Sequence, residues 1–287
     1  NMGFDTYTKL YDSSVSPVIN YGTEVLGYLK NLKSDSIQIK AIKIFLGVHR
    51  FASNDAVQGD MGWLPNHLKR TLNVLRYWNR LVKLDVSRLT RRVFDCEYML
   101  NKKGSWCHFV KDTLADLNME NNYMAKMSCD LGLCRTRLFI LYANIWSNNL
   151  MKKPKLRLYR QIKTEYATER YIMLNLDRNQ RSILAQLRTG VLPLHVETGR
   201  FENKKLEERK CKLCNTEHVE DECHFLFHCS YYDTLRQAFF DEIVLDENED
   251  EAKLKELFMS YTRKLSKYAC NIFNRRKDGL YVNANLQ

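Results

Sequence analysis

Apolar residues recur at intervals of three and four along much of the chain, which is the spacing of an amphipathic helix. The clearest case begins at Pro65 and extends to about Ser87. Its apolar positions are Leu68, Leu72, Leu75, Val82 and Val86, with Trp78 beside them. A second face carries the basic residues Lys69, Arg76, Arg80 and Lys83. We therefore expect one helix here, with an apolar face toward a core and a basic face toward solvent.

An earlier segment carries the start and stop signals of a helix. Ser34 and Asp35 are N-cap candidates, and Gly47 is a candidate stop. Between them Ile37, Ile39 and other β-branched residues would also suit a strand. The cap and stop residues favour a helix from residue 34 to residue 47.

A third helix is expected between Asp177 and Gly190. Asp177 is a good N-cap residue, and Gly190 suits the position just after the C-terminus. The apolar stripe of this segment consists of Ile183, Leu184 and Leu187. Arg181 and Arg188 are seven residues apart, so we expect both on the outer face of the helix.

Near its end the chain is first acidic and then amphipathic. The run from Asp246 to Glu251 is acidic and lacks glycine, which predicts a loop that leads into a helix. Apolar residues at helical spacing then follow at Leu254, Leu257, Phe258, Tyr261, Leu265, Tyr268, Ile272 and Phe273. We predict one long amphipathic helix that packs on a core, and we assign it no chemistry.

The residue counts agree with a mainly helical protein. The 287 residues include only 11 glycines and 4 prolines, too few for the turns of an all-β protein. Apolar residues make up 45% of the chain and charged residues 28%, as in globular domains. The length allows at least one full core, and two cores of modest size.

The formal net charge of +11 suggests a polyanionic partner, although a basic soluble protein without such a partner explains it equally well. One segment has six basic residues and no acidic residue, with Tyr159 among them: Lys152, Lys153, Lys155, Arg157, Arg160 and Lys163. Basic residues interleaved with aromatic residues suit nucleic acids, because the charges follow phosphates while the rings stack on bases. The alternative is a basic linker in which Pro154 limits the start of a helix.

Several features bear on the cellular setting. Nine cysteines is an odd number, and no secretory signal opens the sequence, so we expect reduced thiols in the nucleus or cytoplasm. The most apolar run, from Leu138 to Trp146, is too short to span a bilayer, and we expect no membrane partner. The sequence begins with Asn1 rather than Met, so we expect a fragment of a longer protein.

Four cysteines and three histidines lie between Cys211 and Cys229. The pair Cys211 and Cys214 has the C-x2-C spacing that turns two thiolates toward one tetrahedral zinc ion. The other two ligands must come from Cys223, His224, His228 and Cys229, with His218 farther away. His224 with His228 would use one helical face, whereas His224 with Cys229 requires the chain to leave ideal helix geometry before Cys229. Either set fills four positions, so the zinc would be structural rather than catalytic.

These residues also resemble a known family. The stretches 208–214 and 219–232 are similar to the C-terminal zinc knuckle of reverse transcriptases from LINE-type (non-LTR) retrotransposons. Residues 180–201 look like the segment that leads into this knuckle. The start of the polymerase thumb is similar to residues 17–24, 46–47 and 62–65. The resemblance extends from about Leu10 to Arg236.

The resemblance implies a set of ligands and a set of contacts. It implies Cys211, Cys214, His224 and Cys229 as the zinc ligands, and basic helices that face RNA, DNA or their hybrid. The candidate nucleic-acid-binding residues are Lys69, Arg76, Arg80, Lys83, Lys152, Lys153, Lys155, Arg157, Arg160, Lys163, Arg181 and Arg188. We expect four consecutive regions, namely a thumb-like helical region (1–100), a basic helical connector (101–204), a CCHC zinc knuckle (205–240), and an acidic loop with a C-terminal helix (241–287).

Other features depart from the family pattern. Polymerases of this class hold two metal ions with neighbouring aspartates, and no two aspartates are adjacent in this chain. Some relatives carry a nuclease with a Pro-Asp motif, and none of the four prolines here precedes an aspartate. We therefore expect a fragment that is not an enzyme, whose parent protein would be a reverse transcriptase with its polymerase region as a further partner.

The sequence is compatible with three functions. The first is a non-catalytic nucleic-acid-binding module with a structural zinc knuckle. The second is a zinc-stabilised protein-interaction scaffold without a role in nucleic-acid binding. A cryptic nuclease is the third, and the absence of a carboxylate cluster at useful spacing places it last.

Overall fold

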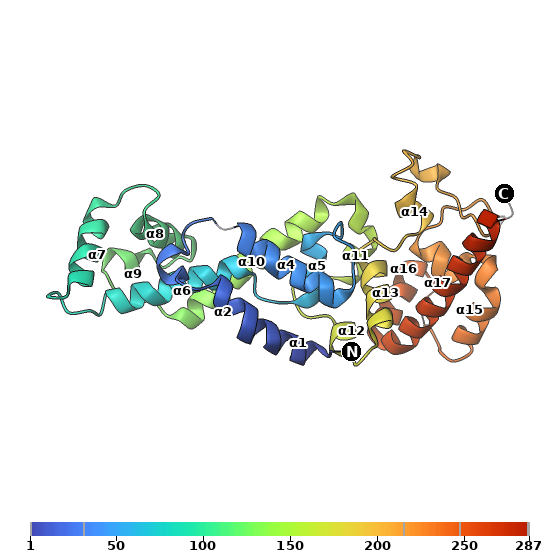
Figure 1. Ribbon diagram of the computed structural model, residues 1–287, viewed down its shortest axis with the longest axis horizontal. Coiled ribbons are helices and arrows are strands. Elements are labelled where there is room, and N and C mark those ends of the chain that lie inside the picture. Colours follow the sequence, from blue (N-terminus) through green and yellow to red (C-terminus); the bar gives the residue numbers. More distant parts are fainter. Residues whose placement is uncertain (1, 31, 215, 247, 286–287) are drawn as a thin grey trace. The chain divides into compact units, whose positions relative to one another are not determined.

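A computed structural model describes residues 2–30, 32–214, 216–246 and 248–285 (Figure 1). Across these residues the chain is mainly helical, which confirms the predicted fold class. The described residues contain no β-strand, and an antiparallel bridge between Lys210 and Val219 is isolated.

The chain forms two compact units, which are described separately. The first unit comprises residues 1–7, 40–63 and 147–287, and the second comprises residues 8–39 and 64–146. Three helices contain residues of both units: α1 (Phe4–Leu10), α4 (Leu32–Leu46) and α10 (Leu131–Met151). The four functional regions expected from the sequence stay a prediction.

The second unit is built around one aromatic core. Its other elements are the π-helical turn η1 (Tyr11–Val15) and the helices α2 (Ser16–Ile19), α3 (Thr23–Leu26), α6 (Asn66–Leu81), α7 (Leu89–Leu100), α8 (Trp106–Asp116) and α9 (Glu120–Met124). Trp78 of α6 is fully buried at the centre, and its ring stacks on Tyr123 with centroids 5.3 Å apart. Its indole Nε1 donates a hydrogen bond to the carbonyl of Met127 at 3.0 Å, so the buried N–H of the ring keeps a hydrogen-bond partner.

The helix expected from Pro65 to about Ser87 is present, but it ends earlier. α6 stops at Leu81, and Val86 is exposed rather than part of the apolar face. The guanidinium of Arg91 donates hydrogen bonds to the carbonyls of Leu81 and Val82 at 3.0 and 2.7 Å. The two carbonyls at the end of the helix therefore accept hydrogen bonds from a side chain about ten residues further along the chain. The periodicity of α6 itself does not show where the helix ends.

The first unit contains the remaining helices. They are α5 (Asn54–Met61), η2 (Pro154–Leu156), α11 (Arg157–Ile162), α12 (Arg170–Met173), α13 (Arg178–Arg188), α14 (His195–Thr198), η3 (Leu206–Glu208), η4 (His224–His228), η5 (Ser230–Tyr232), α15 (Asp233–Phe240), α16 (Asp250–Ser260) and α17 (Thr262–Asn285). α17 packs against α13, α15 and α16 (Figure 1). Leu184, Leu254, Leu265 and Ile272 are fully buried among these helices.

Two of the predicted helices in this part of the chain are confirmed. α4 ends at Leu46 and is followed by Gly47 at φ +67°, so the segment is a helix and not a strand. It begins at Leu32, so Ser34 and Asp35 lie inside the helix and are not its N-cap. α13 has the expected N-cap, because the Asp177 side chain accepts a hydrogen bond from the backbone N–H of Gln180 at 2.8 Å. The side-chain oxygen of Gln180 accepts a hydrogen bond from the backbone N–H of Asp177 at 3.3 Å, which completes a capping box.

The single long helix predicted near the end of the chain is wrong. The chain breaks at Tyr261 into α16 and α17. The Tyr261 hydroxyl donates a hydrogen bond to the Val244 carbonyl at 2.9 Å, and Tyr261 has the non-helical backbone angles φ −115° and ψ 23°. A tertiary contact therefore overrides a periodicity that continues across the break.

Gly62 is a position where only glycine fits. It ends α5 at φ +65°, and a Cβ atom added there would lie 2.3 Å from the backbone nitrogen of Thr168. We expect Gly62→Ala to lower the free energy of unfolding by about 2–5 kcal/mol, because left-handed strain and steric overlap add. Gly22 is the matched control, since it has φ +66° with nothing within 4 Å of an added Cβ. Gly22→Ala should cost only about 1–2 kcal/mol in thermal or denaturant unfolding, and equal losses would contradict the overlap.

Candidate metal centre

The first pair of cysteines lies in a tight loop closed by backbone hydrogen bonds. The N–H of Cys211 donates to the carbonyl of His218 at 2.9 Å, and the N–H of Glu220 donates to that of Arg209 at 3.0 Å. Glu217 turns the loop with φ +55°. This geometry holds the Cys211 and Cys214 side chains on the same side of the loop.

The second pair comes from an irregular helical turn. Residues His224–His228 form the π-helical turn η4, and the N–H of Cys229 donates to the carbonyl of His224 at 2.8 Å. Cys229 itself has the extended angles φ −67° and ψ 117°. The chain thus leaves ideal helix geometry before Cys229, which is the condition that the pairing of His224 with Cys229 requires.

Four side chains meet at this point. The candidate ligand atoms of Cys211, Cys214, His224 and Cys229 all lie within 4.8 Å of one another. The Sγ atoms of Cys211 and Cys229 are 3.8 Å apart, and Cys214 Sγ is 3.3 Å from His224 Nε2. No side chain of the four is more than 9% exposed. This Cys3His cluster could hold a metal ion, and it consists of the four residues that the family resemblance implies.

The three other candidate ligands of the segment lie outside the cluster. His228 is exposed, with its ring nitrogen Nε2 2.5 Å from a carboxylate oxygen of Asp250. His218 is exposed as well, and its ring centroid is 6.0 Å from that of His224. Burial and the nearby Asp221 raise the pKa of Cys223 to about 12, so its thiol stays protonated at neutral pH.

Two thiols of the cluster, those of Cys211 and Cys229, share a hydrogen bond. A hydrogen bond with Cys229 lowers the pKa of Cys211 to about 3, and the same bond raises the pKa of Cys229 above its ordinary range. The N–H of Leu213 also points at Cys211 Sγ, 3.5 Å away. Thiolates are the form that binds metal ions, so these hydrogen bonds favour the binding form at Cys211.

Glu220 connects this cluster to the rest of the first unit. Its carboxylate accepts two hydrogen bonds from Arg276 of α17, both at 2.7 Å, and one from the backbone N–H of His195 at 2.6 Å. Glu220 and Arg276 are both buried. The ring nitrogen Nδ1 of His195 is also 2.5 Å from the Lys210 carbonyl. The loop that carries Cys211 is therefore held to both α14 and α17.

Four of the predicted nucleic-acid-binding residues line one depression of about 640 Å³ in the first unit. The basic residues along it are Lys152, Lys153, Lys155, Arg157, Arg200 and Arg209, against the two acidic residues Glu197 and Glu222. Lys153 pairs with Asp55, Lys155 with Glu197, and Arg157 with Glu222. Lys152 is exposed and has no ion-pair partner among the described residues. We call this depression the basic pocket.

Three predicted residues are buried, and the prediction that Arg181 and Arg188 lie on an outer face is wrong. Arg188 is 1% exposed and pairs with Asp60 and Glu169. Arg181 lies with its guanidinium 4.2 Å from the centroid of the Phe45 ring. Lys163 is buried and pairs with Glu169. Because these three side chains are buried, a phosphate group cannot contact them. Their spacing in the sequence is that of surface residues, but in the fold each cation contacts residues of the core.

The remaining predicted residues lie in two other places. Arg76 and Arg80 are exposed on α6 in the second unit, where they line a hollow of about 370 Å³, and Lys83 is exposed in the turn just after this helix. Lys69 pairs with Asp12 at 3.0 Å. In the first unit, Arg160 donates a hydrogen bond to the Met151 carbonyl at 3.0 Å.

Some residues of the basic pocket carry no recognisable signal in the sequence. Arg200 and Arg209 lie more than forty residues beyond Arg157, and Phe51 comes from the loop before α5. The Phe51 ring is 60% exposed, with the Arg50 guanidinium 4.8 Å from its centroid. The fold alone brings these residues to one place.

Comparison with protein-family models, with curated proteins and with solved structures finds no match to this chain. The resemblance to LINE-type reverse transcriptases therefore stays a prediction. No helix of the described residues combines the length and the apolar character needed to cross a bilayer. All nine cysteines are free thiols.

Proposed function

We propose that this chain is a non-catalytic nucleic-acid-binding module in which a structural zinc ion holds a basic surface in shape. In this proposal it derives from the C-terminal part of a LINE-type reverse transcriptase and works in the nucleus or cytoplasm. We also propose that the chain has no catalytic activity. This part of the proposal rests on the sequence, because no two aspartates are adjacent in it.

The spacing of the four candidate ligands supports zinc as the metal. Zinc–sulfur bonds of about 2.3 Å at tetrahedral angles place two sulfur atoms about 3.8 Å apart, and a sulfur and a nitrogen about 3.6 Å apart. The corresponding distances here are 3.8 Å between Cys211 and Cys229 and 3.3 Å between Cys214 and His224. Four protein ligands leave no open position for a reacting water, which is typical of structural sites.

The basic pocket is the observation that carries the nucleic-acid proposal. Six Lys and Arg side chains from three separate stretches of the chain converge there. Three carboxylates pair with four of them, namely Asp55 with Lys153, Glu197 with Lys155 and Arg200, and Glu222 with Arg157, so the positive charges remain in excess. The exposed ring of Phe51 lines the same depression. It could stack on a base of a strand whose phosphates contact the basic residues. Glu222 lines the pocket and is two residues from His224, so a metal ion in the cluster would also stabilise the pocket wall.

Salt dependence provides the test. Each phosphate contact that a basic residue makes contributes about 0.7 to the slope of log affinity against log salt for a single strand. We expect Lys152→Ala combined with Arg200→Ala to flatten that slope by about 1.4 and to weaken binding of labelled RNA and DNA oligonucleotides. Fluorescence anisotropy across a salt series measures both quantities. Lys152 and Arg200 are chosen because both are exposed.

The matched control removes the same charge elsewhere. Lys102 and Lys103 are exposed in the loop after α7, and their replacement by Ala should leave the slope within error of the unmodified chain. If single-stranded and duplex oligonucleotides all fail to bind at low salt, the proposal is wrong and a protein-interaction scaffold becomes the better account.

A further inference from the structure

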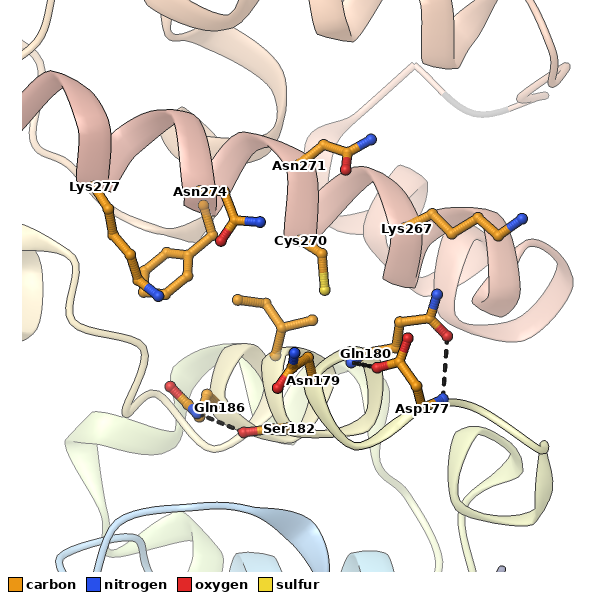
Figure 2. Close-up of a pocket in the computed structure, with 12 residues that line it drawn as sticks. Asp177, Asn179, Gln180, Ser182, Gln186, Lys267, Cys270, Asn271, Asn274 and Lys277 are labelled. Atoms are coloured by element: carbon orange, nitrogen blue, oxygen red, sulfur yellow. Dashed lines mark hydrogen bonds between the residues drawn. The ribbon is translucent and has the colours of Figure 1, made fainter. Parts of the chain in front are cut away.

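A second depression, distinct from the basic pocket, lies between α13 and α17 within the first unit. It has a volume of about 570 Å³, and Figure 2 shows α13 along one wall and α17 along the other. Five carboxamide side chains line it, namely Asn179, Gln180, Gln186, Asn271 and Asn274. We call it the amide cleft.

Three carboxamides of the amide cleft have no hydrogen-bond partner among the described residues. The side chains of Asn179, Asn271 and Asn274 are exposed and make no hydrogen bond to any described residue. Gln186 instead donates to Ser182 Oγ at 2.7 Å and to the Gly47 carbonyl at 3.2 Å. Each free carboxamide offers two N–H donors and an acceptor oxygen in one plane. The cleft therefore presents paired donors and acceptors from both walls.

The amide cleft also has lining residues that are not carboxamides. Ile183 and Phe273 supply apolar surface, and the Cys270 sulfur points between the two helices (Figure 2). Burial and the nearby Asp177 raise the pKa of Cys270 to about 11, so its thiol is neutral at physiological pH. Lys267 and Lys277 line the cleft ten residues apart on α17, which is about 15 Å along the helix axis.

We propose that the amide cleft binds unpaired nucleotides of a single strand of RNA or DNA, with base edges on the carboxamides and phosphates on the two lysines. Asn and Gln are well suited to base edges, because their amides match the donor and acceptor pairs that bases carry. A duplex uses the Watson–Crick edges for pairing, so only an unpaired strand offers them.

The dimensions and the charges of the cleft fit the same ligand. The separation of Lys267 and Lys277 corresponds to about four nucleotide steps at the 3.4 Å spacing of a stacked strand, and to fewer steps of a stretched one. Asp177, the one carboxylate of the lining, accepts a hydrogen bond from the N–H of Gln180 and retains lone pairs for the amino group of a base. Phe273 adds an aromatic ring to the lining, and the Nζ of Lys277 lies over this ring at 4.5 Å from its centroid, so a base that stacks there would displace or adjoin the lysine. This inference rests on the proposed function and specifies which nucleic acid is preferred.

The test compares unpaired and paired forms of the same strand. We expect the intact chain to bind a labelled single strand at least tenfold more tightly than a hairpin duplex of the same composition, with RNA and DNA strands measured in parallel. Asn179→Ala combined with Asn274→Ala should weaken single-strand binding about tenfold or more and leave hairpin binding unchanged. Because both amides are uncharged, the salt dependence of binding should not change. Alanine has the higher helix propensity at both positions, so helix loss would not explain the effect.

The control variant is Asn148→Ala, which removes an exposed carboxamide from α10 outside the cleft and should bind like the unmodified chain. Equal affinity for single strand and hairpin would overturn the amide-cleft proposal, and so would an Asn179/Asn274 variant that binds single strands normally. Either result would leave the basic pocket standing, because that site is tested by the slope against salt. Loss of all binding by the intact chain would instead overturn the proposed function.

Discussion

Cys211→Ser is expected to reduce the zinc content of the purified protein from one equivalent to nearly none. Cys211 is one of four side chains whose ligand atoms lie within 4.8 Å, and serine is a poor zinc ligand at neutral pH. Structural zinc contributes about 10–16 kcal/mol to the folding of small zinc modules. The short apolar run of Phe225, Leu226 and Phe227 cannot replace a contribution of that size. Elemental analysis measures the metal directly.

The same variant should lose local order. Lysines and arginines between residues 204 and 212 offer trypsin several sites, and the loop that carries them is held by Glu220 and by the four candidate ligands. We expect rapid cleavage there in Cys211→Ser and in the unmodified protein after chelation, with protection restored when zinc is added back. Zinc should also dissociate as the pH falls, because protons compete for the cysteine thiolates and for His224.

Cys223→Ser is the matched control for this experiment. Cys223 lies in the same segment and is one residue from His224, but its sulfur is not among the four clustered ligand atoms. It should keep one equivalent of zinc and resist trypsin like the unmodified protein. His228→Ala should do the same, and His224→Ala should behave like Cys211→Ser. A Cys211→Ser protein that retains zinc, or a His228→Ala protein that loses it, would contradict the assigned ligands.

Arg188→Met should lower the stability of the first unit by about 3–5 kcal/mol, because it leaves a buried carboxylate without its cation. Asp60 is 0% exposed, and its oxygens accept hydrogen bonds from Arg188 at 3.0 to 3.3 Å. Among the described residues, only the Tyr171 hydroxyl, at 2.7 Å, would still donate a hydrogen bond to the Asp60 carboxylate. The rings of Tyr159, Tyr171 and Phe258 surround the guanidinium at 5.2 to 5.7 Å, so water has no ready access.

Hydrogen exchange of the α13 amides provides the measurement, because it reports on this helix separately from the second unit. The expected loss corresponds to exchange about 10²- to 10⁴-fold faster. Arg178→Met is the control on the same helix, since Arg178 is exposed, and it should change stability by less than about 0.5 kcal/mol. Adding Asp60→Asn to Arg188→Met should recover part of the loss, because the buried charge is removed. No difference between Arg188→Met and Arg178→Met would show that the buried pair does not contribute to stability.

Features set by neighbouring residues were predictable from the sequence. The mainly helical class follows from periodicity and from the shortage of glycine and proline. The ends of α13 follow from Asp177 and Gly190, because capping acts within one turn of the helix. The crowded cysteines and histidines indicated a metal cluster in the same way, although spacing alone left His228 and Cys229 as alternatives. The irregular turn η4 distinguishes them, and no periodic pattern encodes such a turn.

Features that depend on distant residues were not predictable. Arg188 has the spacing of a surface residue, but its partner Asp60 is 128 positions away. The break at Tyr261 depends on a carbonyl in another segment. The amide cleft requires α13 and α17 to lie side by side, and neither helix shows a motif by itself. In each case the role of a residue depends on a partner far away in the sequence, and only the folded structure shows which partner that is.

The order in which the two units are completed follows from their interrupted make-up. The chain changes unit after residues 7, 39, 63 and 146, so the first unit has begun before the second unit is finished and is completed last. During synthesis, α5 with Asp60 leaves the ribosome long before α13 brings Arg188. A shortened protein that begins at residue 147 would lack Asp60 and would bury Arg188 without that partner. A truncation that keeps the first unit whole must therefore retain residues 1–7 and 40–63 together with residues 147–287.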